Sequence, residues 1–162
     1  MKSKEIKTNA MRFLDKHKLA YDVIQYECDE FTDGIAVADK CGVPYEQSYK
    51  TLVTQGKSNQ YYVFVIPIAK ELDLKAAAKS VGEKSVEMIH VKDITKVTGY
   101  VRGGCSPLGM KKAYDTVFDI SALDHDTIVI SGGRIGSSLR INPEELIKVT
   151  GAKAEAICRQ EA

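Results

Sequence analysis

The chain has 162 residues, of which 44% are hydrophobic and 28% are charged, and its formal net charge is +1. This composition is that of an ordinary globular protein and excludes a disordered tail or a low-complexity linker. A net charge so close to zero also excludes capture of nucleic acid by a strong global field, so any contact with RNA must be local or assisted by a partner.

No segment predicts a membrane span or a secretory leader. The longest apolar run, residues 61–69, is too short to cross a bilayer, and no apolar stretch follows the lysines of residues 1–8. We therefore expect a cytoplasmic protein without membrane contacts.

The four cysteines predict neither a disulfide framework nor a metal site. Cys28, Cys41, Cys105 and Cys158 are widely separated, with no Cys-x-x-Cys pair and no histidine at ligand spacing. We expect reduced and mostly buried thiols, no metal and no other cofactor.

The first third of the chain predicts helix, strand and helix. Residues 4–18 carry an apolar stripe at helical spacing, which is typical of an amphipathic helix. The stripe comprises Ile6, Ala10, Phe13, Leu14 and His17. Residues 20–26 alternate as a strand does, and residues 34–41 predict a short helix that Gly42 ends.

The middle of the chain predicts a β-hairpin followed by two helices and a short strand. Residues 48–54 and 60–68 are rich in β-formers, and the Gln-Gly-Lys-Ser-Asn sequence between them favours a turn. Asp73 is a candidate cap for a helix that reaches Gly82. Residues 85–90 predict a strand, and we expect Asp93 to cap a helix that ends at Gly99.

The last third begins with a glycine-rich loop, residues 99–109, in which no regular element can form. Strands are predicted at 116–120 and 127–131, and a last strand at 154–158. Asn142 and Pro143 predict the start of a helix that Gly151 ends. These elements, without a repeating βαβ pattern, predict one α+β domain over residues 1–162 with a mixed, strongly curved sheet and flanking short helices.

Standard hydrolase motifs are absent from the sequence, and one loop imitates a nucleophilic site. Cys105 and Ser106 lie in the sequence Gly-Gly-Cys-Ser-Pro-Leu-Gly, residues 103–109. A thiol there could be a nucleophile, but no histidine lies near it in sequence to activate it. The glycines could instead let the backbone approach a ligand and donate N–H groups to it, or the loop could be a tight structural turn. Gly132 and Gly133 follow a predicted strand, where ligand-facing loops are common.

Lys50 lies within a β-forming segment, Tyr-Lys-Thr-Leu-Val, residues 49–53. A lysine in such a segment either extends outward to water or is held in a cavity for a purpose. The residues alone leave both interpretations open.

Several of these segments together resemble the YbaK/EbsC family, free-standing relatives of the editing domain of bacterial prolyl-tRNA synthetases. The matching pieces occur in the family's order: Tyr-Lys-Thr-Leu at 49–52, Glu-Leu-Asp-Leu-Lys at 71–75, Lys-Ser-Val-Glu-Met at 84–88, Gly-Tyr at 99–100, Gly-Gly-Cys-Ser-Pro-Leu-Gly at 103–109 and Ser-Gly-Gly at 131–133. The resemblance covers almost the whole chain. It implies a barrel-like mixed sheet and a pocket for the charged 3′ end of a tRNA.

The resemblance also implies roles for particular residues. Lys50 matches the family's pocket lysine, which is needed for deacylation and positions the terminal adenosine or its phosphate. Candidate substrate-binding residues, from this match and from the glycine-rich loops, are Tyr26, Thr51, Gly103, Gly104, Ser106, Ser131 and Gly132.

Two positions depart from the family pattern. Cys105 stands where an aliphatic residue is frequent, and Ser137 and Ser138 occupy a region in which some members carry a functional acidic residue. An acidic role in that region is therefore in doubt for this chain.

The function that the resemblance implies is trans-editing of mischarged tRNA, foremost Cys-tRNA(Pro) and also Cys-tRNA(Cys). The substrate's own thiol would attack the ester carbonyl and form a cyclic thiolactone, which explains the missing nucleophile. Alternatives are a deacylase for another small aminoacyl group, such as Ala-tRNA(Pro), and a non-catalytic module that binds aminoacyl-tRNA or nucleotides. The expected partners are the 3′ end of aminoacyl-tRNA and, in a transient complex, prolyl-tRNA synthetase.

Overall fold

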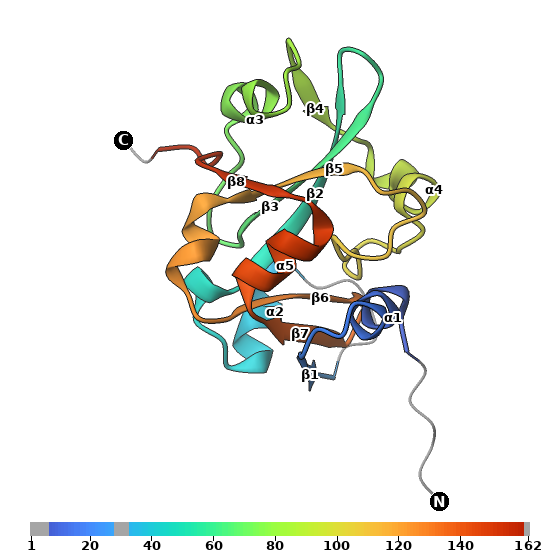
Figure 1. Cartoon of the computed structure of the whole chain (residues 1–162), viewed down its shortest axis with the longest axis vertical. Coiled ribbons are helices and arrows are strands. Elements are labelled where there is room, and N and C mark those ends of the chain that lie inside the picture. Colours follow the sequence, from blue (N-terminus) through green and yellow to red (C-terminus); the bar gives the residue numbers. More distant parts are fainter. Residues whose placement is uncertain (1–6, 28–32, 161–162) are drawn as a thin grey trace, which may run out of the picture.

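A computed structural model describes residues 7–27 and 33–160. The described strands form two sheets, which Figure 1 shows one above the other. The small sheet has the order β1 (Asp22–Gln25), β7 (Ser137–Ile141), β6 (Ile128–Arg134). The large sheet has the order β4 (Val86–Met88), β2 (Tyr49–Gly56), β3 (Tyr61–Pro67), β5 (Asp115–Asp119), β8 (Lys153–Glu155).

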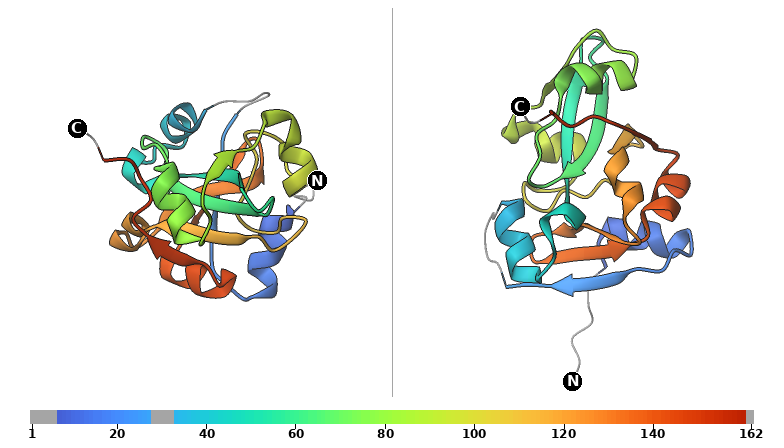
Figure 2. Two further views of the ribbon diagram at one scale, coloured as in Figure 1. Left: turned by 90° about the horizontal axis from the view of Figure 1, so that it is seen from above. Right: turned by 90° about the vertical axis from the view of Figure 1, so that its left-hand side faces the viewer.

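The two sheets meet where β2 begins. The predicted hairpin pairs β2 with β3 antiparallel, from Tyr49 opposite Pro67 to Gln55 opposite Tyr61. β5 is parallel to β3, so the large sheet is mixed. A parallel bridge between Ser48 and Val129 joins the start of β2 to β6 of the small sheet, from which β2 and β3 rise steeply (Figure 2, right). The predicted α+β class with mixed strands is confirmed, but the described strands form two sheets and no closed barrel.

Five α-helices lie around the sheets in the described residues: α1 (Asn9–Lys16), α2 (Gly34–Cys41), α3 (Leu74–Ser80), α4 (Ile94–Thr98) and α5 (Pro143–Thr150). Three 3-10 turns accompany them: η1 (Tyr45–Gln47), η2 (Val91–Asp93) and η3 (Ile120–Asp124). Capping side chains explain the boundaries of two helices. Asn142 accepts a hydrogen bond from the Glu145 N–H at the start of α5, and Asp33 does the same for Ala36 at the start of α2.

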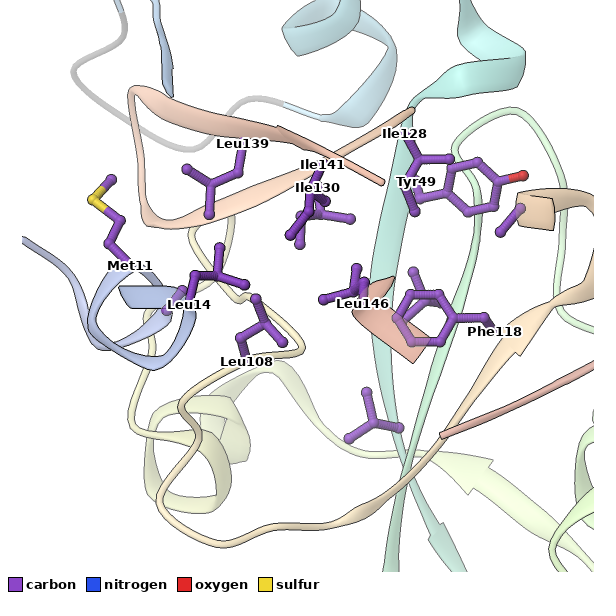
Figure 3. Close-up of a cluster of buried hydrophobic side chains, with 14 residues drawn as sticks. Met11, Leu14, Tyr49, Leu108, Phe118, Ile128, Ile130, Leu139, Ile141 and Leu146 are labelled. Carbon is purple, nitrogen blue, oxygen red and sulfur yellow. The ribbon is translucent and has the colours of Figure 1, made fainter. Parts of the chain in front are cut away.

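The main core fills the space between the two sheets, α1 and α5. It takes alternate residues of the small sheet, Ile128, Ile130, Leu139 and Ile141, as strand geometry requires. Figure 3 shows these side chains facing Met11 and Leu14 of α1, Leu108 of the glycine-rich loop, Leu146 of α5, and Tyr49 and Phe118 of the large sheet. This cluster fixes β6, the start of β2 and the glycine-rich loop relative to one another.

A second core lies on the opposite face of the large sheet. Tyr62, Phe64 and Ile66 alternate along β3 with residues of the main core, and they pack under Ala77 and Ala78 of α3. Because both faces of β3 are buried, the strand reads as a continuous apolar run and not as an alternating one. The central hairpin is therefore held on both sides.

Two predicted helix starts differ from the structure. The first helix begins at Asn9, since the Thr8 side chain accepts a hydrogen bond from the Met11 N–H and caps it; residues 4–6 of the predicted helix lie outside the described part. His17, predicted on the apolar stripe, is exposed at the helix end. Asp93 makes no capping hydrogen bond, because η2 already places its backbone in a helical turn.

The sequence analysis did not foresee β7. Residues 137–141 (Ser-Ser-Leu-Arg-Ile) contain two serines and follow a turn rich in glycine, which concealed the strand. The alternation of Leu139 and Ile141 with polar residues, after the Gly133–Gly136 turn, was the available signal for a hairpin with β6. The last strand is also earlier than predicted, at Lys153–Glu155, with Cys158 in an isolated bridge to Leu72.

The thiols are less buried than predicted. Cys41, Cys105 and Cys158 are free and only partly buried, while Cys28 lies outside the described residues. Among residues 7–27 and 33–160, no group of three or more histidine, cysteine, aspartate or glutamate side chains is placed to hold a metal ion. In the same part of the chain, no helix is long and apolar enough to cross a membrane.

Candidate functional site

A cavity of about 450 Å³ lies where the two sheets meet. Its walls come from the first half of β2, from β6 and β7, from the start of α2 and from the glycine-rich loop. Much of the lining is aliphatic, including Ile35, Val37, Ile68 and Val129. A largely apolar cavity of this volume with a few polar groups is typical of a small-molecule site.

Lys50 and Thr51 are neighbours on β2, and both line the cavity. Lys50 is partly buried, and burial lowers the pKa of its ammonium, while the charges of Glu71 and Cys158 oppose this effect. The Thr51 hydroxyl is buried and has no hydrogen-bond partner among the described residues. A buried hydroxyl without a partner is costly in a protein interior, so Thr51 is a candidate for a hydrogen bond to a ligand.

Strand alternation explains the contribution of the small sheet. Ile128 and Ile130 point their side chains into the main core, so Val129 and Ser131 lie on the opposite face of β6. Ser131 is paired with Ser138 of β7, and both serines line the cavity. Tyr26, just after β1, lines it as well, and its backbone N–H donates to the Gly136 carbonyl.

The two glycines at the start of the loop have different roles. Gly103 lines the cavity with φ +85°, a backbone conformation that favours glycine. Gly104 does not line the cavity; a Cβ there would lie 2.8 Å from the Cα of Arg134, so it lets the loop dock against the β6–β7 turn. Its N–H donates to the Val101 carbonyl and is not available to a ligand. Gly104 therefore lies outside this cavity, and its predicted ligand contact stays a prediction.

Ser106 and Gly132 also lie away from the cavity lining. Ser106 is fully buried, and its hydroxyl accepts the Leu108 N–H, which stabilises the turn into the core. The Gly132 carbonyl accepts a hydrogen bond from the Thr8 hydroxyl and ties α1 to the small sheet. Both positions make structural hydrogen bonds, and their roles as substrate-binding residues stay predictions.

Cys105 does line the cavity, but its thiol is not an activated nucleophile. Burial raises the pKa of Cys105 to about 11, although a hydrogen bond with Thr98 lowers it slightly. At neutral pH the thiol is therefore protonated, and a protonated thiol is a poor nucleophile.

Asp33, Arg102 and Ser138 are among the cavity-lining residues that the sequence analysis did not assign to the site. Asp33 caps α2 and brings a carboxylate to the wall, whereas Arg102 is the single cation of the loop at 99–109. The capping pattern before residues 34–41 was the available signal for Asp33. Nothing in the sequence placed it opposite β2.

The arrangement combines two cationic side chains, Lys50 and Arg102, with one carboxylate, Asp33, and several hydroxyls. Cations favour phosphate oxygens, a carboxylate favours an ammonium group, and hydroxyls bond to ribose and carbonyl oxygens. A ligand that carries a phosphate, a ribose and an amino group within one small volume matches this set.

Comparisons with known proteins identify the family of this chain. The model of the aminoacyl-tRNA editing domain family matches residues 32–149. A protein of Enterococcus faecalis (strain ATCC 700802 / V583), EbsC, named as a proposed Cys-tRNA(Pro)/Cys-tRNA(Cys) deacylase, is 39% identical over 161 residues; the match covers 99% of this chain and 98% of EbsC.

Two crystal structures share the fold. The hypothetical protein APE2540 superposes with a TM-score of 0.85 at 23% identity, over 93% of this chain and 99% of its own. A proposed trans-editing enzyme for prolyl-tRNA synthetase superposes with a TM-score of 0.81 at 23% identity, over 96% of this chain and all of its own. The fold, the cavity and the family match lead to one conclusion: the chain belongs to the aminoacyl-tRNA editing domain family, a family of aminoacyl-tRNA deacylases.

Proposed function

We propose that this enzyme deacylates cysteine mischarged onto proline tRNA, and also cysteine on its own tRNA, by binding the aminoacylated 3′-terminal adenosine in the cavity at the junction of the sheets. The observation that carries the proposal is the set of groups in that cavity: two cations, one carboxylate and the unpartnered Thr51 hydroxyl. EbsC, which is similar over almost the whole chain, is named as a proposed deacylase of the same two substrates.

Lys50 is the residue to which we assign the main role. Its ammonium is partly buried in the cavity wall, where a positive charge attracts a phosphate or a 3′-oxygen that gains negative charge as the ester bond breaks. Thr51 is the next residue on β2, and its unpartnered hydroxyl is suited to a hydrogen bond with the substrate. Asp33 is suited to hold the α-ammonium group of the amino acid.

The nucleophile is the thiol of the substrate. Cys105 is protonated at neutral pH because burial raises its pKa to about 11, so the cavity wall offers no thiolate. The cysteine of the substrate has a thiol with an ordinary pKa near 8.5, of which a few per cent is ionised at pH 7. Its sulfur attacks the ester carbonyl carbon, a cyclic thiolactone forms, and the 3′-oxygen leaves with a proton. The enzyme holds the geometry and stabilises the leaving oxygen.

A panel of charged proline tRNAs tests this function. We expect rapid deacylation of the cysteine ester and much slower deacylation of the alanine and proline esters, because neither of these side chains has a thiol. Equal turnover of the alanine ester would favour the second candidate, a deacylase for small aminoacyl groups in general. Absence of turnover for every ester would contradict the proposal.

In this proposal the enzyme needs a partner protein to distinguish proline tRNA from other tRNAs. The net charge of +1 leaves few phosphate contacts, so we expect the isolated enzyme to distinguish poorly between proline and cysteine tRNAs. A transient complex with prolyl-tRNA synthetase, formed in the cytoplasm, would supply the preference. Deacylation of both cysteine-charged tRNAs with and without the synthetase measures this, and strong discrimination by the isolated enzyme would contradict it.

A further inference from the structure

Positive charge is concentrated in two segments of the chain, residues 1–18 and residues 91–112, each with a formal net charge of +4. Residues 91–112 carry five cations and one carboxylate, a formal net charge of +4, whereas the whole chain has +1 and the other 140 residues therefore carry −3. The five cations are Lys92, Lys96, Arg102, Lys111 and Lys112. We call these five residues the basic rim.

The basic rim reaches the cavity at Arg102. Arg102 lines the cavity directly, and so does Ile94, which lies between Lys92 and Lys96 along the chain. α4 and the loop after it lie on one side of the molecule, on the side of α1 and away from α3 (Figures 1 and 2). An RNA whose last nucleotide occupies the cavity therefore has cations of the basic rim beside its exit.

Hydrogen bonds and packing contacts connect the parts of this segment, residues 91–112. The Tyr114 hydroxyl donates to the Val97 carbonyl at 2.8 Å, and the Tyr100 hydroxyl donates to the Leu108 carbonyl. The Lys111 stem packs on Gly99, and its ammonium donates to the Lys96 carbonyl at the end of α4. These contacts join both ends of the loop to α4.

The charges of the basic rim are accessible to a ligand. All five residues are exposed, and its four lysines make no ion pair with any carboxylate among the described residues. The single carboxylate of the segment, Asp93, lines a separate polar hollow together with Glu87 and so borders a different depression from the cavity. Arg12 of α1 adds a further positive charge close to Tyr100.

We propose that the basic rim binds the phosphate backbone of the tRNA acceptor stem where it leaves the cavity. The inference rests on the proposed function, since it takes the 3′-terminal nucleotide to be in the cavity. Exposed lysines beside a cavity neutralise phosphates without reading bases, which is how a sequence-independent contact is made. A segment with a net charge of +4 on a nearly neutral protein supplies a local contact of that kind. Because it has only five cations, we expect its binding to RNA to be weak.

Charge reversal of two exposed lysines tests the proposal, with a matched pair as the control. Lys96→Glu with Lys112→Glu changes the last turn of α4 and the following loop. Lys79→Glu with Lys84→Glu changes the last turn of α3 and its following loop, on the other side of the molecule. Both pairs lower the net charge equally, so a global effect of charge cancels between them.

The primary measurement is binding of an uncharged RNA hairpin with the sequence of the proline tRNA acceptor stem and its CCA end, at two salt concentrations. We expect the basic-rim pair to bind about tenfold or more weakly and to reduce the slope of log affinity against log salt by roughly 1 for each lost contact. The control pair should bind within about twofold of the unchanged enzyme. Equal losses in both pairs, or no loss in either, would overturn the proposal.

Two further readouts separate this inference from the proposed function. Deacylation of cysteinyl-tRNA should show a raised KM with an unchanged kcat in the basic-rim pair, while hydrolysis of a cysteine ester of adenosine should not change. If the unchanged enzyme hydrolyses neither ester but its RNA binding still distinguishes the two pairs, the proposed function fails and the basic rim stands. If a thermal melt shows that the charge-reversed basic-rim pair does not fold, Lys96→Gln with Lys112→Gln replaces it, and Lys79→Gln with Lys84→Gln is then the control.

Discussion

Two polar regions lie two residues apart along β2, and they differ in how their hydrogen bonds are satisfied. Tyr49 donates to the Ser121 hydroxyl at 2.7 Å, and Ser121 donates to the buried carboxylate of Asp119. Asp119 also accepts the backbone N–H groups of Ile157 and Ser121. Thr51, in contrast, has a buried hydroxyl with no partner among the described residues.

The difference separates polar groups that stabilise the fold from a hydroxyl that we assign to ligand binding. Buried polar atoms in folded proteins are nearly always hydrogen-bonded, so the Asp119 network represents the ordinary case and the Thr51 hydroxyl the exception. The exception lies in the wall of the cavity, beside a lysine whose pKa is lowered by burial. We infer that substitutions in the first region change stability, and that substitutions in the second change turnover.

The largest effect is expected at Lys50. Lys50→Ala should lower the deacylation rate about 100-fold or more, which is roughly 2.7 kcal/mol of barrier, because it removes the charge at the leaving oxygen. Lys57→Ala, at the exposed turn after the same strand, is the control and should keep normal turnover. A Lys50→Ala enzyme with near-normal rates would show that Lys50 takes no part in the reaction.

The lowered pKa of Lys50 also predicts how stability depends on pH. The folded lysine binds its proton less tightly than the unfolded one, whose pKa is 10.5, so burial of the charged form destabilises the fold at neutral pH. The free energy of unfolding therefore rises as the pH increases from the lowered pKa of folded Lys50 towards 10.5, because the destabilisation is lost in this range. Lys50→Ala should therefore melt no lower than the unchanged protein at pH 7, and any advantage should shrink at alkaline pH. An advantage that grows with pH would contradict the direction of the shift.

Asp119 tests the structural region. Asp119→Ala leaves the N–H groups of Ile157 and Ser121 without their acceptor, and we expect a loss of about 2–3 kcal/mol in the free energy of unfolding. The deacylation rate per folded molecule should stay within about tenfold of that of the unchanged enzyme. Asp115→Ala, at the exposed start of the same strand, is the control and should unfold normally. Denaturant unfolding of both variants measures the difference, and equal stabilities would contradict the anchoring role.

Thr51 and Thr54 form a matched pair on β2. Thr51→Val removes a buried hydroxyl without a partner, so the protein should be equally or more stable while turnover falls about tenfold. Thr54→Val removes a buried hydroxyl that donates to the Tyr62 carbonyl, so it should cost about 1 kcal/mol of stability and leave turnover unchanged. The reverse pattern would show that the Thr51 hydroxyl holds the fold.

The smallest effect is expected at Cys105. Cys105→Ala should retain activity within about tenfold, less than 1.4 kcal/mol of barrier, because the raised pKa keeps the thiol protonated. Alkylation of this thiol should be slow at pH 7 and should accelerate only as the pH approaches 11. Rapid labelling at neutral pH, or an acyl group trapped on Cys105, would make it the nucleophile.

The sequence predicted those parts of the fold that local chemistry determines. Asn142, Pro143 and Gly151 mark the bounds of α5, and the turn residues predict the β2–β3 hairpin. β7 was missed because its serines and the preceding glycines resemble a loop, and only pairing with β1 and β6 makes it a strand.

The candidate site was predicted only in part, for a related reason. Tyr26, Lys50, Thr51, Gly103 and Ser131 line the cavity as the family resemblance implied. Asp33, Arg102 and Ser138 join them from segments distant in sequence, and only the packing of α2 and the loop against β2 brings them together. Gly104, Ser106 and Gly132 have the residue types of a ligand loop, but their neighbours in space use them as structural contacts.

The most direct measurement compares cysteine and serine esters on the same proline tRNA. The two substrates differ only in sulfur for oxygen, so size, charge and RNA contacts are held constant. We predict that the serine ester is deacylated at least about 100-fold more slowly than the cysteine ester. A hydroxyl is scarcely ionised at neutral pH, whereas a few per cent of the thiol is ionised. Equal rates for the two esters would contradict attack by the substrate's own thiol and would require a nucleophile from the enzyme or from water.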